Sequence, residues 1–363
     1  MILLVICSLA AAYQVVAITA CLRQLFRPKP RPAADLPPVS VLKPIYGLDD
    51  HFYRAIVSQA SQDYPQYEII FGHSNPDEPA LRVMQRLQAE FPNLPIRIVP
   101  SRTKAANGKV GVLQDLAREA RYPIWVVNDS DIFVEPDYLR TLASELQTAG
   151  LVTCLYRATA DTFPSRLEAL GIATDFAPST LVAPLVGIDE FGLGSTLAFR
   201  SADWNSAGGF ESVADYIADD FQLGKQLSEA GKRVRLSTMV VETHLGAASW
   251  REVWEHQVRW ACTIRVSQGA GYTGLPVTFA SLWALVALAF GHVGLAFVLF
   301  ALRMIMAAMG CIVLRDWKAA SMLWLVPLRD LFGSAVWTAG LIGNEVTWRD
   351  RSLRLTPDGR IVP

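Results

Sequence analysis

The sequence predicts a layered α/β domain that is joined to apolar, membrane-spanning helices. Strand-like and helix-like segments alternate from residue 39 to residue 132, a pattern typical of α/β sheets. Apolar residues make up 52% of the 363 positions and gather in residues 1–22 and 275–343. Most of the charge lies in residues 36–272, which are enough for one large globular domain.

Residues 1–26 are predicted to form a retained membrane anchor. No Lys or Arg precedes the apolar run, although a cleavable signal peptide needs a charged start, and roughly 20 residues suffice to cross a bilayer. Basic residues follow at once, at Arg23, Arg27, Lys29 and Arg31. The positive-inside rule then places the next residues in the cytoplasm, with residues 27–38 as a stiff, proline-rich tether.

Residues 39–272 are predicted to form the cytosolic domain. Strands are expected at residues 39–45, 67–72, 96–100 and 124–132, with helices at about 50–62, at 79–91 and from 107. This is the element order of a doubly wound sheet, in which ligands bind beyond the carboxyl ends of the strands.

The stretch VVNDSDIFVEPD places Asp129 and Asp131 at the end of the fourth strand. In an extended segment these two side chains point the same way, and nearby carboxylates repel unless a cation lies beside them. Hard oxygen ligands select Mg²⁺ or Mn²⁺, often shared with a diphosphate. The alternative is an acidic turn that caps the next helix.

Two later segments extend this pattern. Asp219 and Asp220 of IADDF begin an amphipathic helix, whose dipole stabilises an ionised carboxylate that can act as a general base; a simple helix cap is the alternative. In WEHQVRWACTIR, Arg259 can bind a phosphate and Trp260 offers a stacking face, next to His256. The alternative for this second segment is an interfacial belt of aromatic and cationic residues.

Residues 273–345 are predicted to return to the membrane. Residues 275–314 are long enough for two spans with a break near Gly291 and His292. Residues 321–343 carry Arg329 and Asp330 at their middle, which predicts a re-entrant or interfacial segment, or an ion pair buried between helices. Residues 346–363 are predicted to be a cytosolic basic tail.

The ordered motifs KPIYGLDD, NDSDI, IADDF and a closing RW before apolar helices resemble the ceramide glucosyltransferase family, glycosyltransferase family 21, which has the GT-A fold. The resemblance runs from Val39 to about Val362. It includes the lesser signatures VLKPIYG, DYPQYEIIFG, NGKVGVL, LVTCLYR, SAGGF and WRDRSLRLTPDGRI.

The resemblance implies a role for each matching position. Asp49 is similar to the aspartate that recognises uridine, and Asn107 with Lys109 resembles a segment that lines the nucleotide site. Asp129 and Asp131 match the pair that holds the divalent ion and the UDP diphosphate.

Further along, Asp220 matches the general base. Arg259 and Trp260 match the end of a (Q/R)xxRW motif over the diphosphate and acceptor. His256 stands where that motif has Gln or Arg, and its charge would depend on pH.

The implied activity is an inverting transfer of N-acetylglucosamine or glucose from a UDP-sugar to the hydroxyl of a membrane lipid. A hopanoid polyol is slightly preferred as acceptor, because DSDI, LVTCLYR and the HQxRW-like segment most resemble the bacterial hopanoid-biosynthesis branch; ceramide is the alternative. The expected location is the bacterial inner membrane, with the catalytic domain facing the cytoplasm.

Other classes fit the sequence less well. A scaffold that kept the fold but lost the chemistry should lack the paired acids, and both pairs are present. A processive polysaccharide synthase or a transporter should have more apolar spans. The net charge of -1 gives no basic field for nucleic acid. His51, His73 and His244 are interpreted as structural residues.

Overall fold

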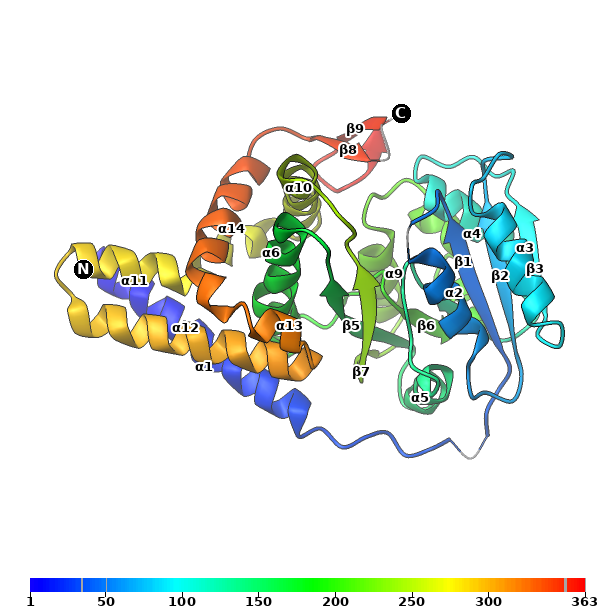
Figure 1. The fold of residues 1–363 in the computed structure, drawn as a ribbon, viewed down its shortest axis with the longest axis horizontal. Coiled ribbons are helices and arrows are strands. Elements are labelled where there is room, and N and C mark those ends of the chain that lie inside the picture. The colour runs from blue at the N-terminus through cyan, green and yellow to red at the C-terminus, as the bar shows by residue number, and fades with distance from the viewer. Residues whose placement is uncertain (34, 50, 349–350, 363) are drawn as a thin grey trace. The chain divides into compact units, whose positions relative to one another are not determined.

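The computed structural model describes residues 1–33, 35–49, 51–348 and 351–362 (Figure 1). Contacts divide the chain into two compact units, which are described separately. The sheet unit comprises Pro28–Tyr156, Asp189–His244 and Arg360–Pro363. The helical unit comprises Met1–Arg27, Arg157–Ile188 and Leu245–Gly359.

Parallel strands form one half of the sheet. The strands β1 (Val39–Ile45), β2 (Tyr67–His73), β3 (Ile96–Pro100) and β4 (Ile124–Val127) lie in the order β3-β2-β1-β4, with Val39 opposite both Tyr67 and Ile124. Every residue of β1, β2 and β4 is buried. Because both faces are covered, these strands read as nearly continuous apolar runs.

The other half of the sheet reverses direction. Strand β6 (Leu197–Arg200) pairs antiparallel with β4 and with β5 (Leu151–Thr159), and β7 (Val234–His244) lies at the far edge. The sheet is therefore mixed, with a parallel half like that of a doubly wound sheet and an antiparallel extension.

One prediction for β4 was wrong. The expected strand at 124–132 ends at Val127, and Ser130 and Asp131 lie in a turn. The amide of Ile132 donates to the carbonyl of Asp129 at 3.4 Å, which curls the chain after the strand. The two acids therefore do not share the extended geometry that the sequence suggested.

Short helices cover the sheet. They are α2 (Phe52–Ala60), α3 (Leu81–Glu90), α4 (Gly108–Glu119), α5 (Tyr138–Glu145), α8 (Ser201–Ser206), η3 (Phe210–Val213) and α9 (Asp219–Glu229). Residue 50, where the second helix was expected to begin, lies outside the described residues. A core that includes Leu42, Val127, Phe199, Leu116 of α4 and Leu223 of α9 joins the sheet to these two helices.

The helical unit contains helices of very different length, several of them strongly apolar. They are α1 (Ile2–Leu25), α6 (Phe163–Gly171), η1 (Ile172–Phe176), α7 (Ala177–Val182), α10 (Trp250–Gly274), α11 (Ala280–Ala289), α12 (Val293–Leu314) and α14 (Val326–Gly340). Shorter elements are η2 (Ala183–Val186), η4 (Leu275–Thr278), α13 (Trp317–Ala320), η5 (Leu323–Leu325) and the antiparallel pair β8 (Glu345–Trp348) and β9 (Arg351–Leu355).

Among the described residues, three helical stretches are long and apolar enough to cross a membrane: Ile2–Leu25, Phe163–Val186 and Val293–Leu314. A fourth span would be the pair Gly271–Thr278 and Ala280–Ala289, which is bent by 60°. The break expected near Gly291 and His292 falls between α11 and α12. The stretch from Phe163 was not expected, because Asp175 and three prolines interrupt its apolar pattern.

A buried charge network joins the helices of this unit. The Arg303 guanidinium, which is fully buried, donates to Asp330 at 2.6 Å and to Asp175 at 2.5 Å. Arg329 lies 3.2 Å from Asp175 and donates to Gln257 at 3.0 Å. Arg329 and Asp330 thus each pair with a charged residue of another helix, Asp175 and Arg303. Whether their segment is re-entrant or interfacial stays a prediction.

The contact units differ from the predicted division of the chain. The sequence placed all of residues 39–272 in one domain, whereas Arg157–Ile188 and the residues from Leu245 onward belong to the helical unit. Residues 349, 350 and 363 of the expected 346–363 tail lie outside the described residues. The membrane and cytosolic boundaries stay predictions.

Candidate active site

A buried lysine supports the turn after β4. Lys43, in the middle of β1, donates from Nζ to Asn128 Oδ1 at 2.8 Å and to the carbonyl of Asp129 at 2.7 Å. Burial lowers the pKa of Lys43 to about 8, against the opposing effect of Asp131 and Asp129. Lys43 was not predicted as a site residue, although a lysine within the apolar run VSVLKPI was a signal.

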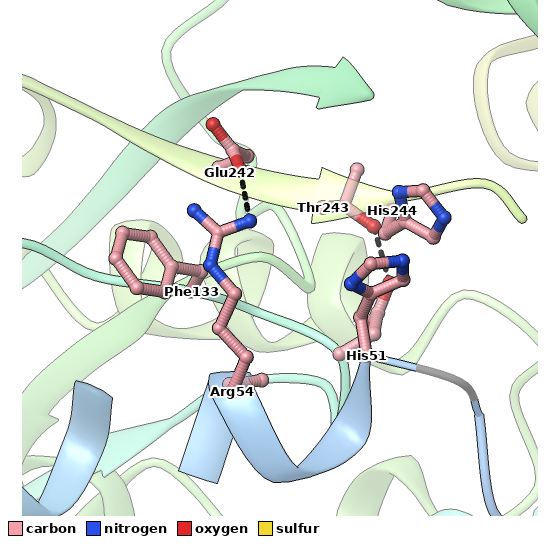
Figure 2. Close-up of a pocket in the computed structure, with 8 residues that line it drawn as sticks. His51, Arg54, Phe133, Glu242, Thr243 and His244 are labelled. Atoms are coloured by element: carbon pink, nitrogen blue, oxygen red, sulfur yellow. Dashed lines mark hydrogen bonds and ion pairs between the residues drawn. The ribbon is translucent and has the colours of Figure 1, made fainter. Parts of the chain in front are cut away.

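Asp131 faces a small pocket in the sheet unit (Figure 2). Its carboxylate accepts a hydrogen bond from the Thr243 hydroxyl on β7. Arg54 lies across the pocket, 3.3 Å from Glu242, and its guanidinium stacks over the Phe133 ring. Burial, together with the charge of Asp129, raises the pKa of Asp131. A cation beside this carboxylate would relieve both effects.

The start of α4 supplies a second positive charge beside the acids. The Asn107 side chain caps the helix by accepting from the amides of Lys109 and Val110. This cap directs Lys109 toward the acids, where its Nζ lies 2.8 Å from Asp129 and 3.5 Å from Asp219. Burial disfavours the charged lysine, but these carboxylates outweigh it and raise the pKa of Lys109.

Asp220 lies at the first turn of α9 and is held by backbone amides. Its Oδ2 accepts from the amide of Gly194 at 2.7 Å, and its Oδ1 accepts from the amide of Phe221 at 2.8 Å. Burial and the neighbouring Asp219 raise the pKa of Asp220 to about 6. A carboxylate with such a pKa is mostly ionised at neutral pH and is basic enough to take a proton.

Gly194 is the point on which these groups converge. A Cβ atom at this position would lie 3.0 Å from Asp129 Oδ2, 3.3 Å from Asp220 Oδ2 and 3.6 Å from Lys109 Nζ. A side chain at this position would therefore crowd both acids, and glycine allows them to lie close to the backbone here. The sequence analysis missed Gly194, because nothing in GLGS alone distinguishes it from a turn glycine.

The close packing of α9 also depends on glycine. A Cβ on Gly224 would lie 2.3 Å from the carbonyl carbon of Phe191. Helix α9 can therefore approach the segment that leads to Gly194, and this approach brings Asp220 within reach of the Gly194 amide.

Asp49 lies in the exposed loop after β1. Its carbonyl accepts from the amide of Phe52 at 3.0 Å, at the start of α2. The loop follows the carboxyl end of β1, the sheet edge from which the turn with Asp129 also emerges.

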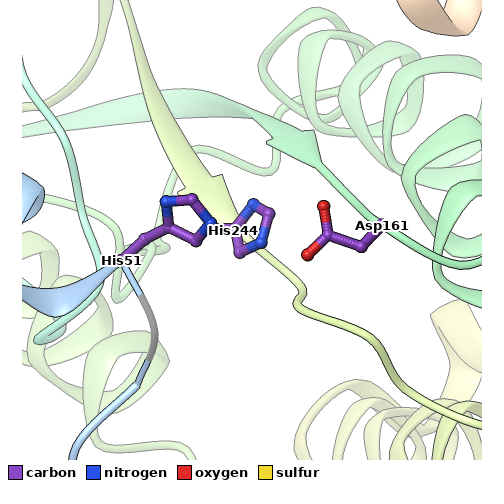
Figure 3. Close-up of side chains that lie close together, drawn as sticks. All are labelled: His51, Asp161 and His244. Atoms are coloured by element: carbon purple, nitrogen blue, oxygen red, sulfur yellow. The ribbon is translucent and has the colours of Figure 1, made fainter.

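Two histidines that the sequence analysis treated separately lie together. The rings of His51, before α2, and His244, at the end of β7, have centroids 3.7 Å apart (Figure 3). Both residues line the pocket of Asp131. Sequence spacing could not find this pair, because the sheet brings together strand ends that are far apart in the chain.

The remaining predicted site residues, His256, Arg259 and Trp260, lie on α10 in the helical unit. Nδ1 of His256 lies 2.5 Å from the Glu168 carboxylate, which also accepts from Gln257 at 2.9 Å. The Trp260 ring contacts the rings of His256 and Phe176, at 5.0 Å and 6.1 Å between centroids. Glu168, buried on α6, was missed from the sequence.

The predicted residues thus form separate groups. Asn107, Lys109, Asp129 and Asp220 form one polar cluster, which Asp131 adjoins. Two carboxylates that lie close enough to raise a pKa are a donor set that fits a hard divalent cation such as Mg²⁺ or Mn²⁺.

Comparisons with known proteins identify the family of this chain. The model of the family described as "Glycosyl transferase family 21" matches residues 2–361. Ceramide glucosyltransferase 1 of Caenorhabditis elegans is 27% identical over 239 residues, which cover 64% of this chain and 51% of that protein. Ceramide glucosyltransferase 3 of the same organism is 24% identical over 353 residues, covering 91% of this chain and 75% of that protein. The chain therefore spans only about half the length of the first relative.

A solved structure has the same fold. The mannosyltransferase PcManGT from Pyrobaculum calidifontis, in complex with GDP-Man and Mn²⁺, matches with a TM-score of 0.54 and 19% identity, covering 93% of this chain and 97% of that chain. At this identity the likeness concerns the fold alone, and it confirms the expected GT-A architecture.

Proposed function

The chain belongs to glycosyl transferase family 21, and from this membership we propose that it transfers a hexose from a UDP-sugar to the hydroxyl of a membrane lipid. The observation that carries the proposal is the convergence of Asp129, Asp220 and Lys109 on Gly194. This arrangement offers an ionised base and a cation within a few ångströms of each other, as a sugar transfer between oxygen atoms requires.

The donor is held by groups of both signs. Lys109 would offset the negative charge that UDP gains as it departs, and Arg259 is proposed to contact the diphosphate through its planar guanidinium. Asp49 is proposed to bind the uracil or ribose. Asp129 and Asp131 would hold a divalent cation, which supplies Lewis-acid stabilisation of the diphosphate when it is bound.

Asp220 is the proposed general base. It takes the proton from the acceptor hydroxyl while that oxygen bonds to the anomeric carbon, and the bond from this carbon to the diphosphate oxygen breaks. The attack comes from the face opposite UDP, so the anomeric configuration inverts. The Gly194 amide fixes the Asp220 carboxylate without neutralising it.

The acceptor is proposed to be a lipid that stays in the bilayer. Helices long and apolar enough to cross a membrane support this choice, and α10 carries Arg259 and Trp260 in the unit that contains them. The relatives described above are named ceramide glucosyltransferases, which favours glucose and ceramide as the first pair to test. A hopanoid polyol with N-acetylglucosamine is the second pair and rests on sequence motifs alone.

One experiment tests the proposal. The full chain, purified in detergent, is incubated with UDP-glucose or UDP-N-acetylglucosamine, with ceramide or a hopanoid polyol, and with Mn²⁺, Mg²⁺ or EDTA. Mass spectrometry should detect a metal-dependent glycolipid, expected first from UDP-glucose and ceramide. A product only from the hopanoid polyol would change the acceptor but not the reaction. No product from any pair would favour a nucleotide-sugar-binding scaffold.

A further inference from the structure

Residues far along the chain contact the loop that precedes α9. In the sheet unit, the amide of Ile361 donates to the carbonyl of Asp215 at 2.7 Å, and Arg360 forms an antiparallel bridge with Tyr216. The Arg360 guanidinium lies 4.8 Å from the centre of the Tyr216 ring, within the range of a cation–π contact. Ile361, in β10 (Ile361–Val362), is 5% exposed.

The loop held in this way also binds Asn107. The Asn107 amide donates to the carbonyl of Ala214 at 2.9 Å, and its side-chain nitrogen donates to the carbonyl of Tyr216 at 2.8 Å. The same nitrogen lies 3.3 Å from the Asp219 carboxylate. Asn107 is fully buried, so these bonds have no competition from water.

A continuous set of contacts therefore runs from Ile361 to the acids. Asn107 caps the helix that carries Lys109, and Asp219 pairs with Lys109 and raises the pKa of Asp220. A shift of the Asp215–Tyr216 loop would move Asn107 and the first turn of α9 together. The position of the Lys109 side chain and the surroundings of the Asp220 carboxylate therefore both depend on that loop.

We propose that the contact of Arg360 and Ile361 with the Asp215–Tyr216 loop positions Asn107 and the first turn of α9 for sugar transfer. These two residues are positioning residues, since they act through the loop and touch none of the reacting groups. The proposal rests on the proposed function to the extent that Asp220 is the base. It assigns a role to the closing motif LTPDGRI, which the donor site does not otherwise use.

Paired variants separate the backbone contact from simple loss of a side chain. Ile361→Pro removes the N–H that binds Asp215, whereas Ile361→Val keeps it. Arg360→Ala removes the cation over Tyr216, whereas Arg360→Lys keeps a cation. Arg86→Ala is the matched control, because Arg86 is also exposed and lies over a tyrosine ring, Tyr53, at 4.2 Å.

Two measurements are made on each full-length variant. Hydrogen exchange of residues 214–220 and 105–110 reports how firmly the Asp215–Tyr216 loop and the start of α4 are held, and it requires no enzymatic activity. The pH dependence of kcat on the acid side, measured together with kcat and the KM for UDP-glucose, reports the environment of the Asp220 carboxylate. A loss of global stability alone would not shift this pH dependence.

We expect Ile361→Pro to speed exchange in both segments, to lower kcat at least roughly tenfold and to shift the acid-side pH dependence, with KM changed less. Arg360→Ala should lower kcat by about two- to fivefold, as suits an exposed cation–π contact. Ile361→Val, Arg360→Lys and Arg86→Ala should resemble the wild type.

Unchanged exchange in Ile361→Pro would overturn the proposal, whatever the activity. Ile361→Pro could also show faster exchange but the same kcat and the same acid-side pH dependence as Ile361→Val. That result would overturn the positioning role while the proposed function stands. If the wild type transfers no sugar, the proposed function fails instead. The affinity of each variant for UDP in the presence of Mn²⁺ is then measured in place of kcat. Equal affinity in Ile361→Pro and Ile361→Val would then overturn the positioning of Lys109.

Discussion

Lys109 Nζ lies 2.8 Å from Asp129 Oδ1 and thereby joins the first turn of α4 to the turn after β4. The same nitrogen lies 3.5 Å from Asp219 at the start of α9. One ammonium group thus connects the acids of NDSDI and IADDF, two motifs that are distant in the sequence. The Lys109 ammonium also supplies positive charge near the proposed position of the departing diphosphate.

Replacing Lys109 with Met should impair the enzyme strongly. A hydrogen bond to a charged group contributes about 1.5–3 kcal/mol, which corresponds to a roughly 10- to 150-fold fall in kcat/KM for the UDP-sugar. Lys225→Met is the control, since Lys225 is an exposed lysine on α9 whose nearest acid, Glu229, is 3.9 Å away. Equal activity of both variants would show that the Lys109 charge is not used.

Gly194→Ala should lower activity with the fold intact. The added Cβ would lie 3.0 Å from Asp129 Oδ2 and 3.3 Å from Asp220 Oδ2, so both carboxylates must shift. We expect a fall in kcat of about tenfold or more, because small misplacements of reacting groups are costly. Gly294→Ala, where no atom lies within 4 Å of the new Cβ, should have wild-type kcat. Wild-type activity in Gly194→Ala would remove the argument for convergence.

The rate should depend on pH through Asp220. Its pKa is about 6, because burial and then the charge of Asp219 disfavour the carboxylate, against the opposing charge of Lys109. Only the ionised base accepts a proton, so kcat should fall about tenfold per pH unit below this value and level off above it. Asp219→Asn removes a negative neighbour and should move this limb to lower pH. A limb that stays in place would contradict the assignment.

The same raised pKa has a consequence for stability. Because the folded chain binds the Asp220 proton more tightly than the unfolded chain, with its ordinary pKa of 3.8, stability decreases as the pH rises from about 4 to 6. Asp220→Asn removes this dependence. The variant should therefore gain melting temperature over the wild type at pH 7.5 but not at pH 4, and the opposite order would contradict the burial of this carboxylate.

The buried network of the helical unit predicts a strong coupling. Arg303→Met leaves Asp330, which is fully buried, without its guanidinium partner and should destabilise the unit by about 3–5 kcal/mol. The double variant Arg303→Met with Asp330→Leu removes both charges and should recover most of this loss. Melting temperatures in detergent measure the effect. Additive losses in the double variant would contradict a direct pair.

The sequence predicted local features better than distant contacts. Apolar runs bounded by turn residues defined β1 and β3 to the residue, and the order of the motifs identified the family. The roles of the acids stay predictions. Lys43 and Gly194 were missed, because their roles arise from strands and loops that meet only in the folded sheet. The stretch from Phe163 was missed since its partly buried Asp175 pairs with Arg303, a residue that lies within a distant apolar run.

The most direct test of the central claim is a single-turnover comparison of the wild type with Asp220→Asn, at saturating UDP-glucose, ceramide and Mn²⁺. Asparagine has nearly the same size but cannot accept the proton. If Asp220 is the general base, the glycolipid product should fall by about 100-fold or more, with the affinity for the UDP-sugar largely unchanged. Near-normal turnover in Asp220→Asn would contradict this assignment.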